Sequence, residues 1–397
     1  MVAPSMNIAA NTIPFVDLSS QNRLLDTEIH AAINRVLDQG DFVMGEAVRS
    51  FEIAFAQACG VKHGIGVACG TDAIALGLQA AGIKPGDEVI LPANTFVATL
   101  IGVMRTGATP VLVDCDPNTA LIDLNAAATA ITQRTRAIVP VHLYGQMVSP
   151  SALLELASTY DIIIFEDAAQ AHLAECEGYR AGSVGVAAAY SFYPSKNLGA
   201  FGDGGMLVTR NDDIAQAAQT LRNYGAPRKY YHTEVGTNSR LDTIQAAVLL
   251  TKLPYLDGWN GDRYRIAQQY DTLLQPLAEF GIRPIQNQNG QGHVYHLYVI
   301  EVGETCHIDR DVLQATLNDH NIQTGIHYPL PCHLQPAYAT LGYKEGSFPH
   351  AERLCRNILS LPMYPGMSES QVQRVVETIQ MISVDNPAAS AHSLLTR

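Results

Sequence analysis

Short apolar runs alternate with helical patterns over the first two-thirds of the chain, and this alternation restricts the possible folds more than any other feature. The runs predicted to be strands are residues 64–69, 88–91, 110–114, 137–143, 162–165, 187–192 and 205–209. Helical patterns at 73–81 and 95–105 separate the first of them. Such βαβ units predict an α/β fold with a mainly parallel sheet covered by helices on both faces. Ligands of these sheets bind beyond the carboxyl ends of the strands, so chemistry is expected in residues that follow strands.

The pattern changes after residue 241. A helix is predicted over 242–252, Pro254 breaks it, and a second helix is predicted over 263–279. A polar hinge at 286–292 then precedes a strand at 294–302. We therefore predict a large domain of residues 1–253 and a smaller C-terminal α+β domain of residues 254–397.

Composition excludes several classes of protein. The chain has 25 basic and 38 acidic residues, a net charge of −13, and no basic run, which argues against nucleic-acid binding. No apolar stretch is long enough to span a membrane, and the N-terminus lacks a signal-peptide pattern, so a cytoplasmic location is expected. Seven scattered cysteines show no ligand spacing, which predicts reduced thiols and no metal site.

Lys196 lies in the segment SFYPSKNLGAFGDGG, between a predicted strand and a glycine-rich bend. Glycine lets backbone approach a ligand closely, and partial loss of water lowers the pKa of an amine. A lysine in this setting is a candidate for a Schiff base with a carbonyl group. The alternative is a lysine in an ordinary surface loop.

Asp167 follows a strongly apolar run in IIIFEDAAQAH, 29 residues before Lys196. A carboxylate at a buried strand end needs a cationic or hydrogen-bonding partner. The alternative is an N-cap for an Ala-rich helix after the strand. Together, a buried carboxylate and a Schiff-base lysine are what pyridoxal 5'-phosphate (PLP) requires, because the carboxylate keeps the pyridine nitrogen protonated.

The phosphate of such a cofactor needs donors, and Gly70-Thr71 follows a strand and opens a helix. A helix N-terminus offers free N–H groups and a favourable dipole, although the same dipeptide is also an ordinary cap. Ser191 is a second hydroxyl candidate at a strand end. Phe96, after another strand, is a candidate for stacking on the ring or, alternatively, a core aromatic.

Several longer motifs in the same order carry a family resemblance. They are GTDAIALGLQAAGIKPGDEVILPANTFVAT, GATPVLVDCDP, VHLYGQ, FEDAAQAH, SFYPSKNLGAFGDGG and NSRLDTIQAAVLLTKL. Between about residues 14 and 365 the chain resembles the nucleotide-sugar aminotransferases of the DegT/StrS family, which are PLP enzymes of fold type I. The resemblance implies an aspartate-aminotransferase-like large domain that binds PLP.

The resemblance also implies roles for single residues. Lys196 would bind the cofactor covalently, Asp167 would pair with the pyridinium, and Gln170 would contact the 3-oxygen of the ring. Phe96 would stack on the ring, while Thr71 and Ser191 would bind the phosphate. Asn238, in GTNSRLD, would reach the phosphate from the neighbouring subunit, which implies a homodimer with shared active sites. A simple turn residue is the alternative for Asn238.

Substrate contacts are implied for four further residues. His327 and Tyr328 resemble the substrate-side His-Tyr pair of sugar 3-aminotransferases, and Lys229 and Tyr230 would contact the nucleotide diphosphate. Leu173 follows His172 where the family often has glycine, so no role is assigned to His172. Cys332 is also left without a role.

The activity implied by the resemblance is transfer of an amino group from L-glutamate to a nucleotide-linked keto-6-deoxysugar. C3 of a TDP-linked 3-keto-6-deoxyhexose is favoured, because IHYPLPCHLQPAY and RNYGAPRKYYH look closer to the 3-aminotransferases. The alternatives are a 4-aminotransferase and a regulatory protein on the same fold. A sugar dehydratase on this fold would carry histidine in place of Lys196.

Overall fold

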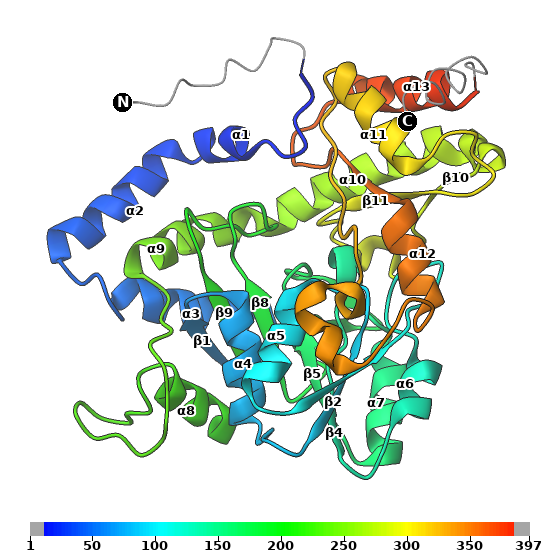
Figure 1. The fold of residues 1–397 in the computed structure, drawn as a ribbon. Helices are drawn as coiled ribbons and strands as arrows, with labels where there is room; N and C mark the ends of the chain where they lie inside the picture. Colours follow the sequence, from blue (N-terminus) through cyan, green and yellow to red (C-terminus); the bar gives the residue numbers. More distant parts are fainter. Residues whose placement is uncertain (1–11, 385–397) are drawn as a thin grey trace.

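The large part of the protein is built on a seven-stranded sheet, seen in a computed structural model that describes residues 12–384 (Figure 1). The strand order is β3–β2–β4–β5–β8–β9–β1, and only β9 runs antiparallel to its neighbours. The strands are β1 His63–Val67, β2 Glu88–Pro92, β3 Thr109–Val113, β4 Thr135–Ile138, β5 Ile163–Asp167, β8 Ala187–Ser191 and β9 Gly205–Thr209. The prediction of a mainly parallel sheet is confirmed, with strand ends shifted by a few residues.

Helices cover both faces of this sheet, as predicted. The crossover helices are α4 Gly70–Ala80, α5 Val97–Arg105, α6 Leu124–Ala130 and α7 Pro150–Tyr160. The connections through α4 and α5 run across the sheet in the opposite direction to those through α6 and α7. Because crossover connections are right-handed, α4 and α5 lie on one face and α6 and α7 on the other. The contacts between α4 and α5, and between α6 and α7, agree with this arrangement.

Five further helices complete this part of the molecule. They are α1 Leu18–Arg23, α2 Asp26–Gln39, α3 Glu46–Ala58, α8 Asp212–Leu221 and α9 Thr243–Lys252. Helix α9 packs against α2 and α3, while α8 packs against α4. In Figure 1 the segment between α8 and α9 extends from the body of the molecule as a long green loop.

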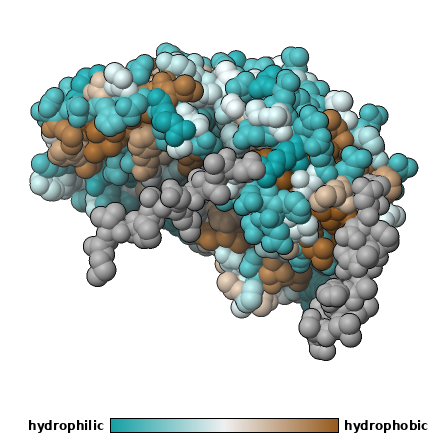
Figure 2. All heavy atoms as spheres, turned by 90° about the horizontal axis from the view of Figure 1, so that it is seen from above, coloured by the Kyte–Doolittle hydropathy of each residue, from teal (hydrophilic) through white to brown (hydrophobic). Residues whose placement is uncertain are grey.

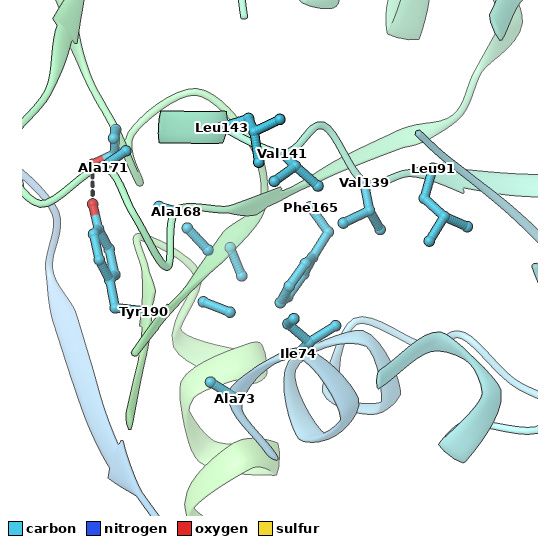
Figure 3. Close-up of a cluster of buried hydrophobic side chains, with 14 of the residues drawn as sticks. Ala73, Ile74, Leu91, Val139, Val141, Leu143, Phe165, Ala168, Ala171 and Tyr190 are labelled. Carbon is cyan, nitrogen blue, oxygen red and sulfur yellow. Dashed lines mark hydrogen bonds between the residues drawn. The ribbon is translucent and has the colours of Figure 1, made fainter. Parts of the chain in front are cut away.

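The core between β5 and α4 is closely packed. Figure 3 shows the Phe165 ring pointing from β5 towards α4, beside Ile74. Gly77 of α4 makes this approach possible, because a Cβ there would lie 2.5 Å from both the Phe165 ring and the Leu207 side chain. This packing holds the first turn of α4 close to the carboxyl ends of the strands.

The C-terminal part has a sheet and a core of its own. Its antiparallel sheet has the order β10–β11–β12, and helix α10 is longer than the helix predicted at 263–279. The elements are α10 Leu256–Leu274, β10 Ile282–Pro284, β11 Tyr298–Val302, α11 Arg310–Asp319, α12 Pro349–Asn357, β12 Ile358–Leu361 and α13 Glu369–Val384. The predicted strand at 294–302 forms regular pairs only from Tyr298 onward.

Packing crosses the predicted domain boundary at residue 253 in both directions. Ile13, from the start of the described chain, joins the core of the C-terminal sheet. Cys332 and Leu354 in turn pack into the core of the large sheet. The boundary itself stays a prediction. The packing shows that the two parts contact each other closely beside the strand ends.

Two further expectations concern membranes and metals. Within residues 12–384, no helix is long and apolar enough to cross a membrane. The same residues contain no group of three or more His, Cys, Asp or Glu side chains placed to hold a metal ion.

We predict that Gly77→Ala lowers the free energy of unfolding by about 1–3 kcal/mol, because the new methyl group overlaps the Phe165 ring and Leu207. Gly261→Ala is the matched control, since a Cβ at Gly261 in α10 meets nothing within 4 Å. Helix propensity alone favours alanine by up to about 1 kcal/mol, so this control should be neutral or stabilising. Thermal unfolding of both variants measures the difference, and equal shifts would contradict the packing argument.

Candidate active site

A pocket of about 340 Å³ lies at the carboxyl edge of the large sheet, where β2, β5 and β8 end. The C-terminal part closes it from the other side with His296, His327 and Tyr328. The predicted site residues that line this pocket are Gly70, Thr71, Phe96, Asp167, Gln170, Ser191, Lys196, His327 and Tyr328. These residues are widely separated in sequence, and the parallel sheet brings them together.

Lys196 follows β8 in a tight bend, and its backbone N–H donates to the carbonyl of Tyr193 at 2.8 Å. Burial lowers the pKa of the Lys196 amine to about 8, and the nearby Asp167 carboxylate partly opposes this shift. A larger fraction of this amine is therefore neutral near pH 8 than of an ordinary lysine. Lys196 faces the pocket rather than forming part of an ordinary surface loop.

Asp167 is the last residue of β5, and its side chain is buried at the pocket. The Thr99 hydroxyl donates to Oδ2 at 2.7 Å, and the Ala169 N–H donates to Oδ1 at 3.1 Å. Burial raises the pKa of Asp167, whereas these two hydrogen bonds favour the ionised carboxylate. No helix follows Asp167, because residues 168–174 form turns, so its interpretation as a helix cap is wrong.

The first turn of α4 lies directly against the end of β8. A Cβ on Gly70 would be 2.8 Å from the Cβ of Ser191, so only glycine allows this approach. A Cβ on Gly205 would likewise lie 2.4 Å from the backbone of Cys69. The start of α4, with the hydroxyls of Thr71 and Ser191, thus lines the pocket, and the N-terminus of a helix carries N–H groups that have no partner within the helix.

Aromatic and amide groups form another wall. The ring of Phe96 is 50% exposed, with its centroid 5.1 Å from that of Tyr328, so Phe96 is not a core aromatic. The Gln170 amide donates to the Tyr328 hydroxyl at 3.2 Å, and its oxygen accepts the Tyr144 N–H at 2.7 Å. Gln170 is therefore fixed between the two parts of the molecule.

His327 lies between the pocket and the C-terminal sheet. Its Nδ1 is 2.9 Å from the Ser360 hydroxyl, and its ring stacks on Phe15 with centroids 5.6 Å apart. Burial, together with the positive charge of Lys196, lowers the pKa of His327 to about 4. This imidazole is therefore neutral near pH 7.

Three predicted residues lie outside this pocket, on the long loop between α8 and α9. Lys229, Tyr230 and Asn238 are exposed, and the Tyr230 side chain is 85% accessible. The Lys229 amine lies over the Tyr230 ring, 5.1 Å from its centroid. Ser239, next to Asn238, donates to Asp72 at 2.5 Å and accepts the Ala68 N–H at 3.1 Å, which fixes the end of this loop near the start of α4.

Sequence reasoning left His172 and Cys332 without roles, and both prove to support the site. The His172 Nε2 donates to the carbonyl of Ser191 at 2.9 Å, and burial lowers the pKa of His172 to about 3. The Cys332 thiol donates to the carbonyl of Thr95 at 3.3 Å. Each of them holds backbone beside a pocket residue.

Sequence reasoning missed Thr99 and His296. Thr99 lies four residues after Thr95, a spacing of about one helical turn, and the two hydroxyls are 2.8 Å apart. That spacing was a usable signal for a hydroxyl pair. His296 had no local signal, because its position in the pocket depends on how the C-terminal part packs.

The residues present fit PLP. The pocket supplies an amine for the cofactor carbonyl, a buried carboxylate for the ring nitrogen and an aromatic face for the ring. The close approach at Gly70 leaves a helix N-terminus with two hydroxyls for the phosphate. Fold and site together define a PLP-dependent enzyme of fold type I, with Lys196 and Asp167 as its central pair.

Comparison with known proteins agrees with this class. Residues 23–380 match the model of the DegT/DnrJ/EryC1/StrS aminotransferase family. The chain belongs to this family, and its cofactor is PLP.

Two relatives and one solved structure illustrate the similarity. The chain is 45% identical to the dTDP-3-amino-3,6-dideoxy-alpha-D-galactopyranose transaminase of Aneurinibacillus thermoaerophilus, over 92% of this chain and 98% of that protein. It is also 45% identical to the pleiotropic regulatory protein of Geobacillus stearothermophilus, over 92% and 97% of the two chains. The crystal structure of S. venezuelae DesV with a ketimine intermediate matches with a TM-score of 0.90 and 44% identity, covering 95% of this chain and all of that one.

We predict that, in cofactor-free protein, labelling of Lys196 by an amine-reactive reagent rises with a midpoint near pH 8. Asp167→Asn should move this midpoint to lower pH, because the carboxylate favours the protonated amine. Asp213→Asn, on the exposed side of α8, is the control and should leave the midpoint unchanged. Peptide mass spectrometry across a pH series provides the measurement, and an unchanged midpoint in Asp167→Asn would contradict the coupling.

Proposed function

We propose that this enzyme transfers the amino group of L-glutamate to C3 of a TDP-linked 3-keto-6-deoxyhexose. The observation that carries the proposal is that Lys196 and the buried Asp167 lie together in one pocket. The chain that holds them is similar over most of its length to a dTDP-3-amino-sugar transaminase. The name states the substrate of the relative, and we propose the same substrate class for this chain.

The residues of the pocket have different roles in this reaction. When bound, PLP supplies an electron sink for the carbanion formed on the substrate. Lys196 Nζ takes the proton from the α-carbon of L-glutamate and later returns a proton to the sugar carbon that receives the nitrogen. A pKa near 8 suits both steps, because the amine can accept and release a proton near neutral pH.

Asp167 would hold the proton on the ring nitrogen, and the Thr99 and Ala169 hydrogen bonds orient its carboxylate and favour the ionised form. The start of α4, Thr71 and Ser191 bind the phosphate. Phe96 and Tyr328 lie against each other at the pocket, and together they would cover the ring and limit the access of water to the reacting carbon.

The fold is compatible with two other functions, which are amination at C4 and regulation. Amination at C4 of a 4-keto sugar uses the same residues and differs in how the sugar is turned. A regulatory role is suggested by the name of the Geobacillus relative. The pocket favours catalysis, because a regulator needs neither a lysine with a pKa lowered to about 8 nor a carboxylate buried beside it.

We propose a cytoplasmic location on the sequence features alone.

We predict that purified enzyme with PLP, L-glutamate and the TDP-3-keto sugar gives a product with nitrogen on C3, identified by NMR. The Lys196→Ala variant should lose at least about 10³-fold in rate, because Lys196 is the one lysine among the described residues that line the pocket. Amination of a 4-keto substrate, with none at C3, would contradict the position while leaving the aminotransferase activity intact.

We also propose a homodimer in which each active site is completed by the partner. The loop that carries Lys229, Tyr230 and Asn238 is exposed and extends from the body of its own subunit (Figure 1). Large apolar side chains are exposed on and after α2 and on α3, namely Leu37, Phe42, Val43 and Ile53. Figure 2 shows apolar surface at the left-hand end of the molecule, where α2 lies. Such surface supports a protein interface beside the loop.

Mixing two inactive variants tests the shared site. Lys196→Ala and Asn238→Ala homodimers should each be impaired, and subunit exchange should restore activity to some sites if both residues serve one composite site. Up to about a quarter of sites in an equal mixture would be intact, since half of the dimers are mixed and each has one wild-type site. No recovery after confirmed exchange would contradict the proposal.

A further inference from the structure

His296 lies in the pocket, although nothing in the mechanism above uses it. It precedes β11, and its side chain is 8% exposed, with that surface facing the pocket. Its Nδ1 is 3.1 Å from the side-chain oxygen of Asn197, the residue next to Lys196. Because this polar ring is buried beside the reacting lysine, the hydrogen bonding of its second nitrogen, Nε2, must also be explained.

The orientation of Asn197 determines which nitrogen of His296 carries the proton. The Asn197 amide nitrogen is 2.9 Å from the carbonyl oxygen of Val294, which can only accept a hydrogen bond. The same nitrogen donates to the Asn260 side-chain oxygen at 2.9 Å. Asn260 is fixed in turn, because its own amide donates to the carbonyl of His172 at 2.9 Å. The oxygen of Asn197 must therefore face His296, and His296 must donate from Nδ1.

The ring is neutral in this position. Burial lowers the pKa of His296 well below its usual range, and the neighbouring Lys196, Arg263, His327 and His172 lower it further. With the single proton on Nδ1, Nε2 carries a bare lone pair. No hydrogen-bond partner for Nε2 exists among residues 12–384, and this nitrogen is not sealed within the protein.

A bare acceptor nitrogen selects among the groups that enter this pocket. Carboxylates and phosphates offer only acceptors and gain nothing from it. The one donor of L-glutamate is its ammonium group, which is consumed at the reacting carbon. A sugar hydroxyl is a donor that remains free, and Lys196 lies near enough to His296 for the charge of its amine to lower the pKa of the imidazole.

We propose that His296 Nε2 accepts a hydrogen bond from a hydroxyl of the sugar next to the carbon that is aminated. His296 thus acts in the sugar half of the reaction and not in the glutamate half. This inference rests on the proposed function and adds to it a residue that recognises the acceptor substrate.

Separate half-reactions test the inference. In the first, L-glutamate converts bound PLP to pyridoxamine phosphate, which is followed by absorbance. In the second, the TDP-keto sugar reverses the change. His296→Phe should slow the second half-reaction at low sugar concentration by about tenfold to hundredfold and leave the first within a few-fold of wild type. His293→Phe replaces another buried histidine, which lies outside this pocket, and serves as the control.

Binding to cofactor-free protein gives a readout without catalysis. Calorimetry compares TDP, a TDP-6-deoxyhexose and the analogue that lacks the hydroxyl next to C3. His296→Phe should weaken binding of the hydroxylated sugar by about tenfold and bind TDP and the deoxy analogue as wild type does. His296→Gln should recover part of the loss, since its amide can donate to Asn197 while its oxygen accepts.

The possible failures are distinguishable. Wild-type protein that fails the first half-reaction contradicts the proposed function itself. Equal losses in both half-reactions of His296→Phe, or equal weakening for both sugars, would assign His296 a structural role and overturn the inference. Unchanged kinetics and binding in His296→Phe would also overturn it.

Discussion

The electrostatic balance between Asp167 and Lys196 is the interaction on which the rest of the site depends. Burial alone raises the pKa of the carboxyl group and lowers that of the amine, so each would tend towards its neutral form. Their mutual attraction opposes both shifts. The pairing of β5 with β8 brings the two groups close together. Asp167 ends β5 in register with Ala189 of β8, and Lys196 lies in the bend after β8, seven residues beyond Ala189.

Close backbone approach is the second constraint, and it explains why small residues surround the site. Gly70 and Gly205 let the start of α4 meet the ends of β8 and β9, where any Cβ would overlap its neighbours. Gly77 does the same one and a half to two turns further along α4, against Phe165. The position of the turn at Gly70-Thr71 therefore depends on the packing of an entire helix against the sheet.

The C-terminal part completes the pocket rather than forming a separate unit beside it. Arg263 of α10 is buried and donates to the carbonyls of Tyr295 and His296, which holds the segment that enters the pocket. Cys332 ties the other C-terminal segment to the loop before α5. The C-terminal core is therefore linked directly to residues that line the pocket.

The sequence by itself predicted the parallel sheet, and it indicated Lys196, Asp167 and the turn at Gly70-Thr71 as candidate site residues, because each of these depends on strand periodicity or on residues next to a strand end. It could not exclude a helix after Asp167, since the run Ala168–Ala169 has helical propensity and only the turns at 168–174 remove it. Only the tertiary structure showed the hydrogen bonds that His172, His296 and Thr99 make at the pocket. These bonds join residues far apart along the chain, and local sequence does not record them; for Thr99 the sequence offered only its spacing from Thr95.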